Sequence, residues 1–280
     1  MVTTNGFAKR LILYVLVALT LFTAIFPFLM MLSTALKPSA ETISLNPTFF
    51  PRHITWENFR DVLNPDVFPF WRYFLNSFQI SFATALISVV VGTMGAYSFA
   101  RLDYKGRGVF QKGVLFIYMF SGVLLIVPLY KMVTAAGLYD TKVSLVIVYI
   151  VLTMPVTLYM LGNYFRTIPE SLEEAALIDG LNRFQVIYKI IVPLSLPAIA
   201  SVFIYVFMIA WNDYLFASIF ITSEDKMTLP IGLSHLFQTK NFVWGRMMAA
   251  SLLTAVPIVI LFSLVEKYFS GGLTEGGVKG

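Results

Sequence analysis

Six stretches of mostly apolar residues dominate this sequence, and together they exclude a water-soluble fold. They run approximately Leu11–Leu36, Asn76–Ala100, Gly113–Val133, Val143–Asn163, Ala198–Ile221 and Met247–Val265. A helix needs about 20 such residues to cross the hydrocarbon core of a bilayer. Charged residues make up only 12% of the chain, against about 25% in an average soluble domain. The sequence therefore predicts an all-α membrane protein with six transmembrane helices.

The first stretch is the one segment that could be a cleaved signal peptide, because Lys9 and Arg10 precede it. Its apolar core is longer than the roughly 7–15 residues of a signal peptide, and Lys37-Pro38 ends it sharply. We therefore interpret it as an uncleaved span.

Lysine and arginine near the ends of the spans predict their orientation. The loop after the second span carries Arg101, Lys105, Arg107 and Lys112 against a single acid, Asp103. This excess places the loop, and with it both termini, on the cytoplasmic side of the membrane. The chain is then one transmembrane domain, 1–280, with an outer segment at 37–75, a cytoplasmic loop at 164–197, an outer loop at 222–246 and a cytoplasmic tail at 267–280. Prolines throughout 37–75 favour an irregular cap there.

Several kinds of chemistry lack the residues they need. The chain has no cysteine and only two histidines, His53 and His235, so no cluster of ligands for a metal is present. No Gly-x-x-x-x-Gly-Lys-Ser/Thr loop exists to bind ATP phosphates, and no basic run is interleaved with aromatics for nucleic acid. The sequence favours a protein that is not an enzyme. A proton-coupled carrier would usually bury more than one ionisable residue, and Asp213 is the only clear one.

The cytoplasmic loop at 164–197 predicts two short helices joined by a turn. Ser171 and Glu174 have the spacing of a capping box, which places a helix start at Leu172. Gly180 stands where a left-handed residue ends a helix.

A second helix is expected after this turn. Asn182 and Gln185 can cap its start, and Pro193 is expected to end it. On the first helix, Ala175, Ala176, Leu177 and Ile178 are apolar although they lie outside the bilayer. Such residues form either a partner surface or a contact with the protein's own helix ends, and the residues alone leave both open.

The spacing in this loop resembles the signature loop of ABC importer permeases. The pattern is Glu174-Ala175-Ala176, three residues, Gly180, nine residues, Ile190, one residue and Val192-Pro193. The family usually has leucine in place of Val192. By this resemblance the loop is a coupling element that docks into a groove of a separate ATPase subunit, through Glu174, Ala175, Ala176, Gly180, Ile190 and Pro193.

Further segments resemble the maltose-type, carbohydrate-uptake branch of that family. They are Leu36-Lys37-Pro38, Asn46-Pro47, Thr55-Trp56-Glu57-Asn58-Phe59, Asn76-Ser77, Trp211-Asn212-Asp213 and the glycine-rich end from Gly271. The resemblance implies a type I ABC importer permease fold in a bacterial cytoplasmic membrane. It also implies a homologous second permease subunit, two ATPase subunits that bind ATP and Mg, and an extracytoplasmic solute-binding protein. The chain itself would bind no cofactor. The expected solute is a sugar, and the alternative is a polyol or a glycerol phosphate ester.

Trp211-Asn212-Asp213 offers a candidate solute pathway together with Tyr205. A carboxylate in an apolar helix should face a bundle interior or a water-filled cavity, and helical spacing puts Tyr205, Met208, Asn212 and Phe216 on one stripe. The alternative is that these polar residues only bond neighbouring helices. The outer loop at 222–246 is expected either to meet the solute-binding protein or to be a plain connector.

Overall fold

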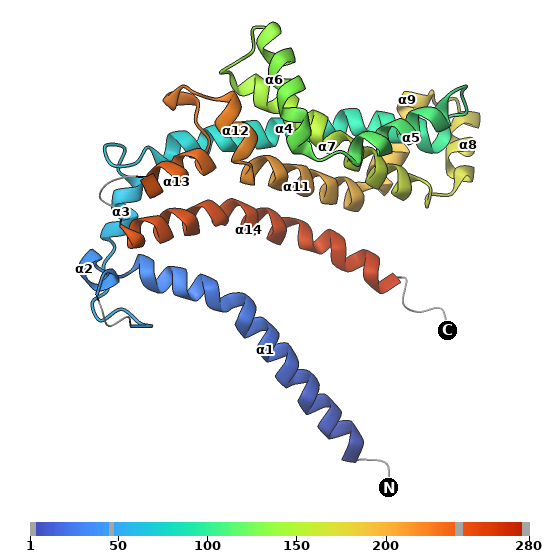
Figure 1. Ribbon diagram of the computed structural model, residues 1–280. Helices are drawn as coiled ribbons and strands as arrows, with labels where there is room; N and C mark the ends of the chain where they lie inside the picture. The colour runs from blue at the N-terminus through green and yellow to red at the C-terminus, as the bar shows by residue number, and fades with distance from the viewer. Residues whose placement is uncertain (1–3, 45–47, 239–242, 276–280) are drawn as a thin grey trace. The chain divides into compact units, whose positions relative to one another are not determined.

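The computed structural model describes residues 4–44, 48–238 and 243–275, and within these residues it contains helices and no strand (Figure 1). The helices are α1 (Thr4–Ala35), α2 (Ser39–Thr42), α3 (Glu57–Leu63), α4 (Phe70–Arg101), α5 (Arg107–Tyr118), α6 (Ile126–Ala135), α7 (Lys142–Phe165), α8 (Glu170–Ile178), α9 (Arg183–Val186), α10 (Val192–Leu194), α11 (Leu196–Asn212), α12 (Leu215–Phe220), α13 (Leu229–Gln238) and α14 (Trp244–Glu275). Two 3₁₀ turns, η1 (Gly122–Leu125) and η3 (Glu224–Lys226), and one π-helical turn, η2 (Ile187–Ile191), complete them. The predicted all-α class is confirmed.

Four of the described helices are long and apolar enough to cross a membrane, namely α1, α4, α7 and α14, and there are up to six spans if each of two bent pairs counts as one. One bent pair joins Arg107–Tyr118 to Gly122–Ala135 at 100°, and the other joins Arg183–Leu194 to Leu196–Asn212 at 83°. The third predicted span is therefore interrupted. The 83° bend at Ser195 lies before the fifth predicted span, which is instead interrupted between α11 and α12. α14 continues as a helix into the predicted tail as far as Glu275, and 276–280 lie outside the described residues.

Pro128 explains why the third predicted span is not one continuous helix. The sequence prediction placed Pro128 inside the span, whereas the structure places it at the third residue of α6. A proline is tolerated in the first turn of a helix because the N–H groups there have no partner within the helix. Pro128 thus belongs to the start of a new helix after the break.

The chain divides into two units, one made of Met1–Trp71 with Leu233–Val256 and the other of Arg72–Gly232 with Pro257–Gly280. In the first unit, the buried Asn58 of α3 holds the end of α1. Its amide nitrogen donates to the carbonyl oxygens of Ala35 and Lys37 at 2.8 and 2.9 Å. Two separate sequence motifs, at 36–38 and 55–59, thus meet in one contact, and Arg246 pairs with Asp61 at 2.5 Å nearby.

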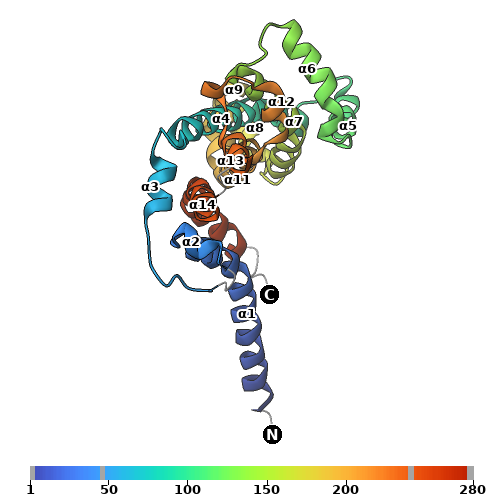
Figure 2. The ribbon, with the colours of Figure 1, turned by 60° about the vertical axis from the view of Figure 1, so that its left-hand side comes forward.

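In the second unit, α4, α7 and α11 lie side by side (Figures 1 and 2). Every fourth residue of α4 and of α11 is aromatic where the two helices meet, and the six rings contact one another in a ladder. They are Phe74, Phe78 and Phe82 of α4 and Phe203, Phe207 and Trp211 of α11. Neighbouring rings are 5.5–6.5 Å apart between centroids. Such pairs contribute about 0.5–1.5 kcal/mol each beyond the area they bury.

Glycines let α4 and α7 approach closely. A Cβ atom at Gly92 would overlap the side chain of Thr157, and one at Gly95 would lie 2.6 Å from Leu158. Small residues are typical of helix contacts in membranes, where close packing drives association.

Asp140 organises the turn between α6 and α7. Its backbone is left-handed, with φ of 57°, and its N–H donates to the carbonyl oxygen of Phe220. The carboxylate accepts hydrogen bonds from the backbone N–H groups of Thr222 and Ser223 at 2.8 and 2.9 Å, from the Ser223 hydroxyl, and from Lys226 at 3.1 Å. Burial alone would raise the pKa of Asp140, but these donors outweigh it and hold that pKa well below its ordinary value.

We expect Asp140→Asn to lower the stability of the protein by about 1.5–3 kcal/mol, the usual contribution of hydrogen bonds to a charged group. Asparagine tolerates the left-handed backbone, so the exchange removes the charge without adding strain. Because the native pKa is depressed, this contribution is present above the ordinary aspartate pKa of about 3.9 and is lost as the pH falls below it. Thermal unfolding of the detergent-purified protein at pH 7.5 and at pH 3 measures both effects. Equal melting temperatures for wild type and variant at pH 7.5 would contradict the interpretation.

Candidate functional site

The predicted coupling loop, 164–197, begins with α8, but this helix starts earlier than the sequence predicts. It starts at Glu170 rather than at Leu172, and its N-terminal flank is Pro169, with no side-chain cap. The predicted capping box of Ser171 and Glu174 is therefore wrong. Pro169 brings a fixed φ of about −65° to the helix start, and Glu170 and Glu173 then lie in the first turn, where the helix dipole favours acids.

The turn after α8 has the predicted geometry. Gly180 has φ of 87°, and the N–H of Leu181 donates to the carbonyl oxygen of Ala176 at 3.0 Å, as in a glycine-terminated helix. Asn182 and Gln185 form a reciprocal capping box at the start of α9, with bonds of 2.8 and 2.9 Å. Both predictions are confirmed.

Pro193 does not end the second helix, so that prediction is wrong. The helical path runs from α9 through the π-helical turn η2 into α10, which contains Pro193, and it bends only at Ser195. A proline ring in an α-helix would clash with the carbonyl group of the fourth residue before it. The wider π-helical turn immediately before Pro193 relieves that clash.

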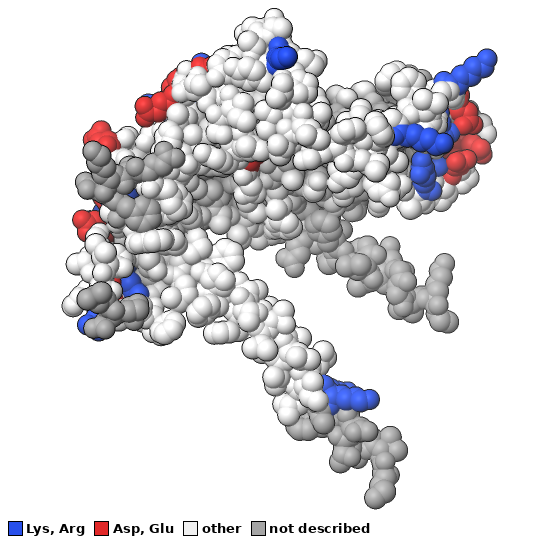
Figure 3. All heavy atoms as spheres, in the orientation of Figure 1, with Lys and Arg blue, Asp and Glu red and all other residues white. Residues whose placement is uncertain are grey.

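The coupling residues expected from the resemblance differ in exposure. Glu174, Ala175, Gly180 and Pro193 are exposed, Ile190 is half-buried, and Ala176 is buried. The sequence left open whether the apolar residues of α8 form a partner surface or pack against the protein itself. Ala176 packs inside the protein, whereas Ile178 is 85% exposed. Charged side chains gather around α8 and α5 at this end of the second unit, as Figure 3 shows.

The buried acid of α8 is Glu173, beside the Glu174 that the sequence pattern singles out. Glu173 accepts hydrogen bonds from Nε of Arg101 at 2.5 Å and from the hydroxyl of Tyr97 at 3.0 Å. The side chains of Arg101 and Glu173 are only 5% and 7% exposed. Two residues near the end of α4 therefore hold α8 from within the protein.

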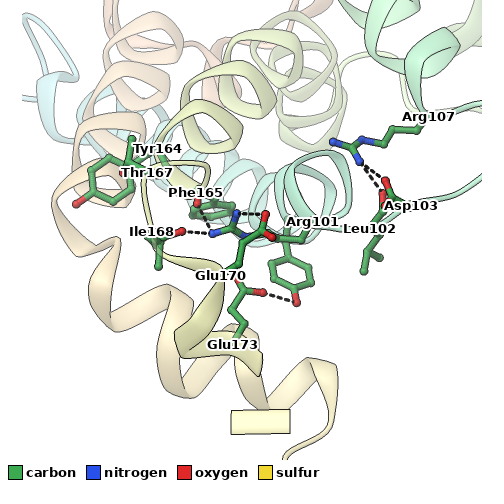
Figure 4. Close-up of polar contacts among 11 residues, drawn as sticks. Arg101, Leu102, Asp103, Arg107, Tyr164, Phe165, Thr167, Ile168, Glu170 and Glu173 are labelled. Carbon is green, nitrogen blue, oxygen red and sulfur yellow. Dashed lines mark hydrogen bonds and ion pairs between the residues drawn. The ribbon is translucent and has the colours of Figure 1, made fainter. Parts of the chain in front are cut away.

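Arg101 also reaches the end of α7 and the turn that follows it (Figure 4). Its Nη2 donates to the carbonyl oxygen of Phe165 at 2.8 Å and to that of Ile168, and its Nη1 pairs with Glu170 at 3.1 Å. The planar guanidinium presents five donors in a fixed fork, so one side chain joins three segments. Sequence reasoning used Arg101 only as a sign of orientation. The spacing of Glu170 and Glu173, on one face of a helix, was the available signal for a basic partner.

The four candidate pathway residues lie in different surroundings. Trp211 is fully buried, between the rings of Phe74 and Phe207. Asp213 lies just after α11, where its carboxylate accepts hydrogen bonds from the Tyr149 hydroxyl at 2.8 Å and from the N–H of Ala217 at 3.0 Å.

Asp213 therefore stands at a break between helices and not inside one, and the predicted stripe ends at Asn212, since Phe216 belongs to α12. Asn212 is exposed, and its amide nitrogen donates to the carbonyl oxygen of Met208 at 2.9 Å.

Tyr205 lines a cavity of about 220 Å³, which the other three candidates do not line. The cavity lies beside the break between α5 and α6, and its wall includes Tyr118, Gly122 and Thr153. Irregular backbone at membrane depth is tolerated only where protein covers it or where it borders a water-filled space. Tyr118 and Tyr205 both line this cavity. At this cavity, polar groups lie beside irregular backbone.

We expect Glu173→Ala to cost about 3–5 kcal/mol of stability, because Arg101 would stay buried without its main partner. The adjacent Glu174→Ala is the matched control, and as an exposed substitution it should change stability by less than about 0.5 kcal/mol. Thermal unfolding of both purified variants checks this. If Glu173→Ala and Glu174→Ala lowered the stability by similar amounts, the result would instead support a helix cap formed by Glu174.

Comparison with known proteins identifies the family. Residues 88–270 match the model of the binding-protein-dependent transport system inner membrane component. The chain is 49% identical to the inner membrane ABC transporter permease protein YcjP of Escherichia coli (strain K12), over 100% of both chains. It is 35% identical to the trehalose/maltose transport system permease protein MalG of Thermococcus litoralis, over 97% of this chain and 98% of that one.

The fold has a counterpart among solved structures. A chain from the crystal structure of a bacterial ABC transporter involved in the import of the acidic polysaccharide alginate superposes with a TM-score of 0.81 at 22% identity, covering 96% of this chain and 99% of that one. The fold of this chain thus occurs in a chain of a solved ABC transporter. The chain belongs to the family of binding-protein-dependent transport system inner membrane components, the permease subunits of ABC importers.

Proposed function

We propose that this permease subunit forms half of a translocation pathway for a sugar and that two separate ATPase subunits drive it through the loop at 164–197. The observation that carries the proposal is the exposed surface of α8 around the Gly180 turn, where Glu174, Ala175 and Ile178 face outward. A nine-residue helix is too short to be stable alone, yet here Arg101 and Tyr97 fix it in place. A rigid helix with an exposed apolar end is suited to a groove on a partner.

The remaining partners follow from the same proposal. The chain has no phosphate-binding loop, so ATP and Mg would be bound by the ATPase subunits. A homologous second permease subunit completes the pathway, and the outer loop at 222–246 receives the solute from an extracytoplasmic binding protein. Both termini lie on the cytoplasmic side, as the basic residues after the second span favour.

The cavity lined by Tyr118 and Tyr205 favours a sugar over the alternatives. Sugars are bound by aromatic faces beside hydroxyl and amide groups, and the lining here is aromatic and apolar with hydroxyl groups. A glycerol phosphate ester would require a cationic partner for its phosphate, and no lysine or arginine lines this cavity. A polyol has no ring face to stack on an aromatic side chain. The relatives named for trehalose and maltose support the same choice.

Gly180 provides the test of ATPase docking. We expect Gly180→Asp to leave the protein in the membrane and to lower uptake strongly, because it places a charge in the proposed docking surface. Gly180→Asn is the matched control, since both residues have similar size and both tolerate a left-handed backbone. A Cβ atom at this position meets nothing within 4 Å in the described structure. Co-purification of the ATPase subunits and uptake are both measured. Full uptake and normal co-purification in Gly180→Asp would refute docking at this turn.

Tyr205 and Trp211 test the solute pathway. We expect Tyr205→Ala to change the ranking of solutes, because the ring lines the cavity. Trp211→Ala should lower the uptake of all solutes together with the amount of assembled complex, because its ring is buried in the aromatic ladder. Uptake of maltose, trehalose, glycerol 3-phosphate and a polyol such as sorbitol, each normalised to assembled complex, separates the two effects. If Tyr205→Ala changes the uptake of all four solutes by the same factor, this cavity is not the pathway.

A further inference from the structure

α4 is bonded to its neighbours at both ends, and this arrangement suggests a role beyond membrane anchoring. At its last residue, Arg101 contacts α8 through Glu173 and Glu170. Near its other end, Asn76 donates to the carbonyl oxygens of Asp225 and Met227, both at 2.9 Å. These outer contacts hold the backbone of the loop that follows α12.

The outer contacts are as well buried as the inner ones. Asn76 is 3% and Ser77 is 2% exposed, and the Ser77 hydroxyl accepts a hydrogen bond from the N–H of Leu229 at 2.8 Å. An amide that donates to two backbone carbonyls fixes the loop relative to the helix, whatever side chains the loop carries. Movement of α4 therefore moves the backbone at 225–229.

The helix between these contacts is well suited to transmit movement. α4 has 32 residues and contains no proline. The other three long helices of the described structure, α1, α7 and α14, contain Pro27, Pro155 and Pro257. Prolines are the usual sites at which a long helix kinks. At about 1.5 Å of rise per residue, Asn76 and Arg101 are separated by roughly 38 Å along the axis, which is enough to cross a bilayer. The aromatic ladder and the close contact with α7 further support α4 along its length.

We propose that α4 is a rigid rod that communicates the nucleotide state of the ATPase subunits to the outer loop at 222–229, with Arg101 and Asn76 as the positioning residues at its two ends. The proposal rests on the docking of α8 proposed above. When a docked ATPase moves α8, the buried contact between Arg101 and Glu173 moves α4 with it. At the outer face, Asn76 and Ser77 then shift the loop, which changes its exposure to solvent.

The absence of cysteine from the chain allows a direct test. Asp225→Cys introduces a thiol in the outer loop, at an exposed side chain next to the carbonyl group that Asn76 binds. The rate at which a membrane-impermeant maleimide labels this thiol is measured in the full complex, without nucleotide and with Mg-AMP-PNP. We call the protein with only Asp225→Cys the parent, and we expect the nucleotide to change its labelling rate. In Arg101→Gln and in Asn76→Ala, the ratio of the labelling rate with nucleotide to the rate without it should move toward one by at least about fivefold. Fivefold is the lower end of ordinary coupling between sites.

Arg107→Gln is the matched control. Arg107, the first residue of α5, pairs with Asp103 at 2.7 Å only six residues beyond Arg101 (Figure 4). It also donates to the carbonyl oxygen of Leu102, so both of these contacts stay within the short connection from α4 to α5. It should retain the parental ratio. Arg101→Lys keeps the charge without the fork of donors and should show an intermediate ratio.

The outcomes separate this proposal from the docking proposal. The rod proposal is wrong if Arg101→Gln and Asn76→Ala both keep the parental ratio of labelling rates in complexes that contain the ATPase subunits. Where Arg101→Gln does not assemble, Asn76→Ala decides alone, because it leaves the inner end intact, and a parental ratio there overturns the rod. A parent that fails to hold the ATPase subunits refutes the proposed docking instead. A parent that holds them but is labelled at the same rate with and without nucleotide overturns the rod.

Discussion

A chain in a bilayer has to satisfy its backbone hydrogen bonds within the protein, because the hydrocarbon offers none. Long helices meet this demand by themselves, but every interruption needs a side chain to replace the missing partner. Asn58 does so at the end of α1, Asn76 at the outer loop, Asp140 before α7 and Asp213 before α12. These four short polar side chains bond to backbone groups, and they mark four of the places where the fold departs from simple spans.

The second constraint is the burial of charge at the C-terminal end of α4. A buried guanidinium is tolerable only when its donors are occupied, and Arg101 occupies them with two carbonyl oxygens and two carboxylates. The same contacts that make its burial possible also determine where α8 can lie. Stability and geometry therefore have a common origin here, which is why a loop helix of nine residues can present a defined surface.

Some local patterns were readable from the sequence, whereas the Ser171–Glu174 capping box and the helix end at Pro193 were wrong predictions. Contacts between distant segments could not be predicted. The Gly180 turn and the Asn182–Gln185 cap depend on a few adjacent residues, and the structure has both. Of the predicted apolar spans, four are single long helices in the described structure. The Arg101–Glu173 pair joins positions 72 residues apart, so nothing in either local pattern predicts it. The breaks at Ser121 and Asp213 were missed for a similar reason. Hydropathy averages over a window, and Asp213 ends its helix through a bond to Tyr149 that only the fold creates.

The exposed apolar side chains of the loop at 164–197 also affect how the protein behaves in the cell before it assembles with its partners. Ile178 and Phe184 are 85% and 69% exposed, and apolar groups exposed outside the membrane are what chaperones and proteases bind. A copy without its partners displays these groups continuously, whereas a docked copy would hide them. The cellular amount of this subunit should consequently follow the supply of its partners, since surplus copies would keep these apolar groups exposed.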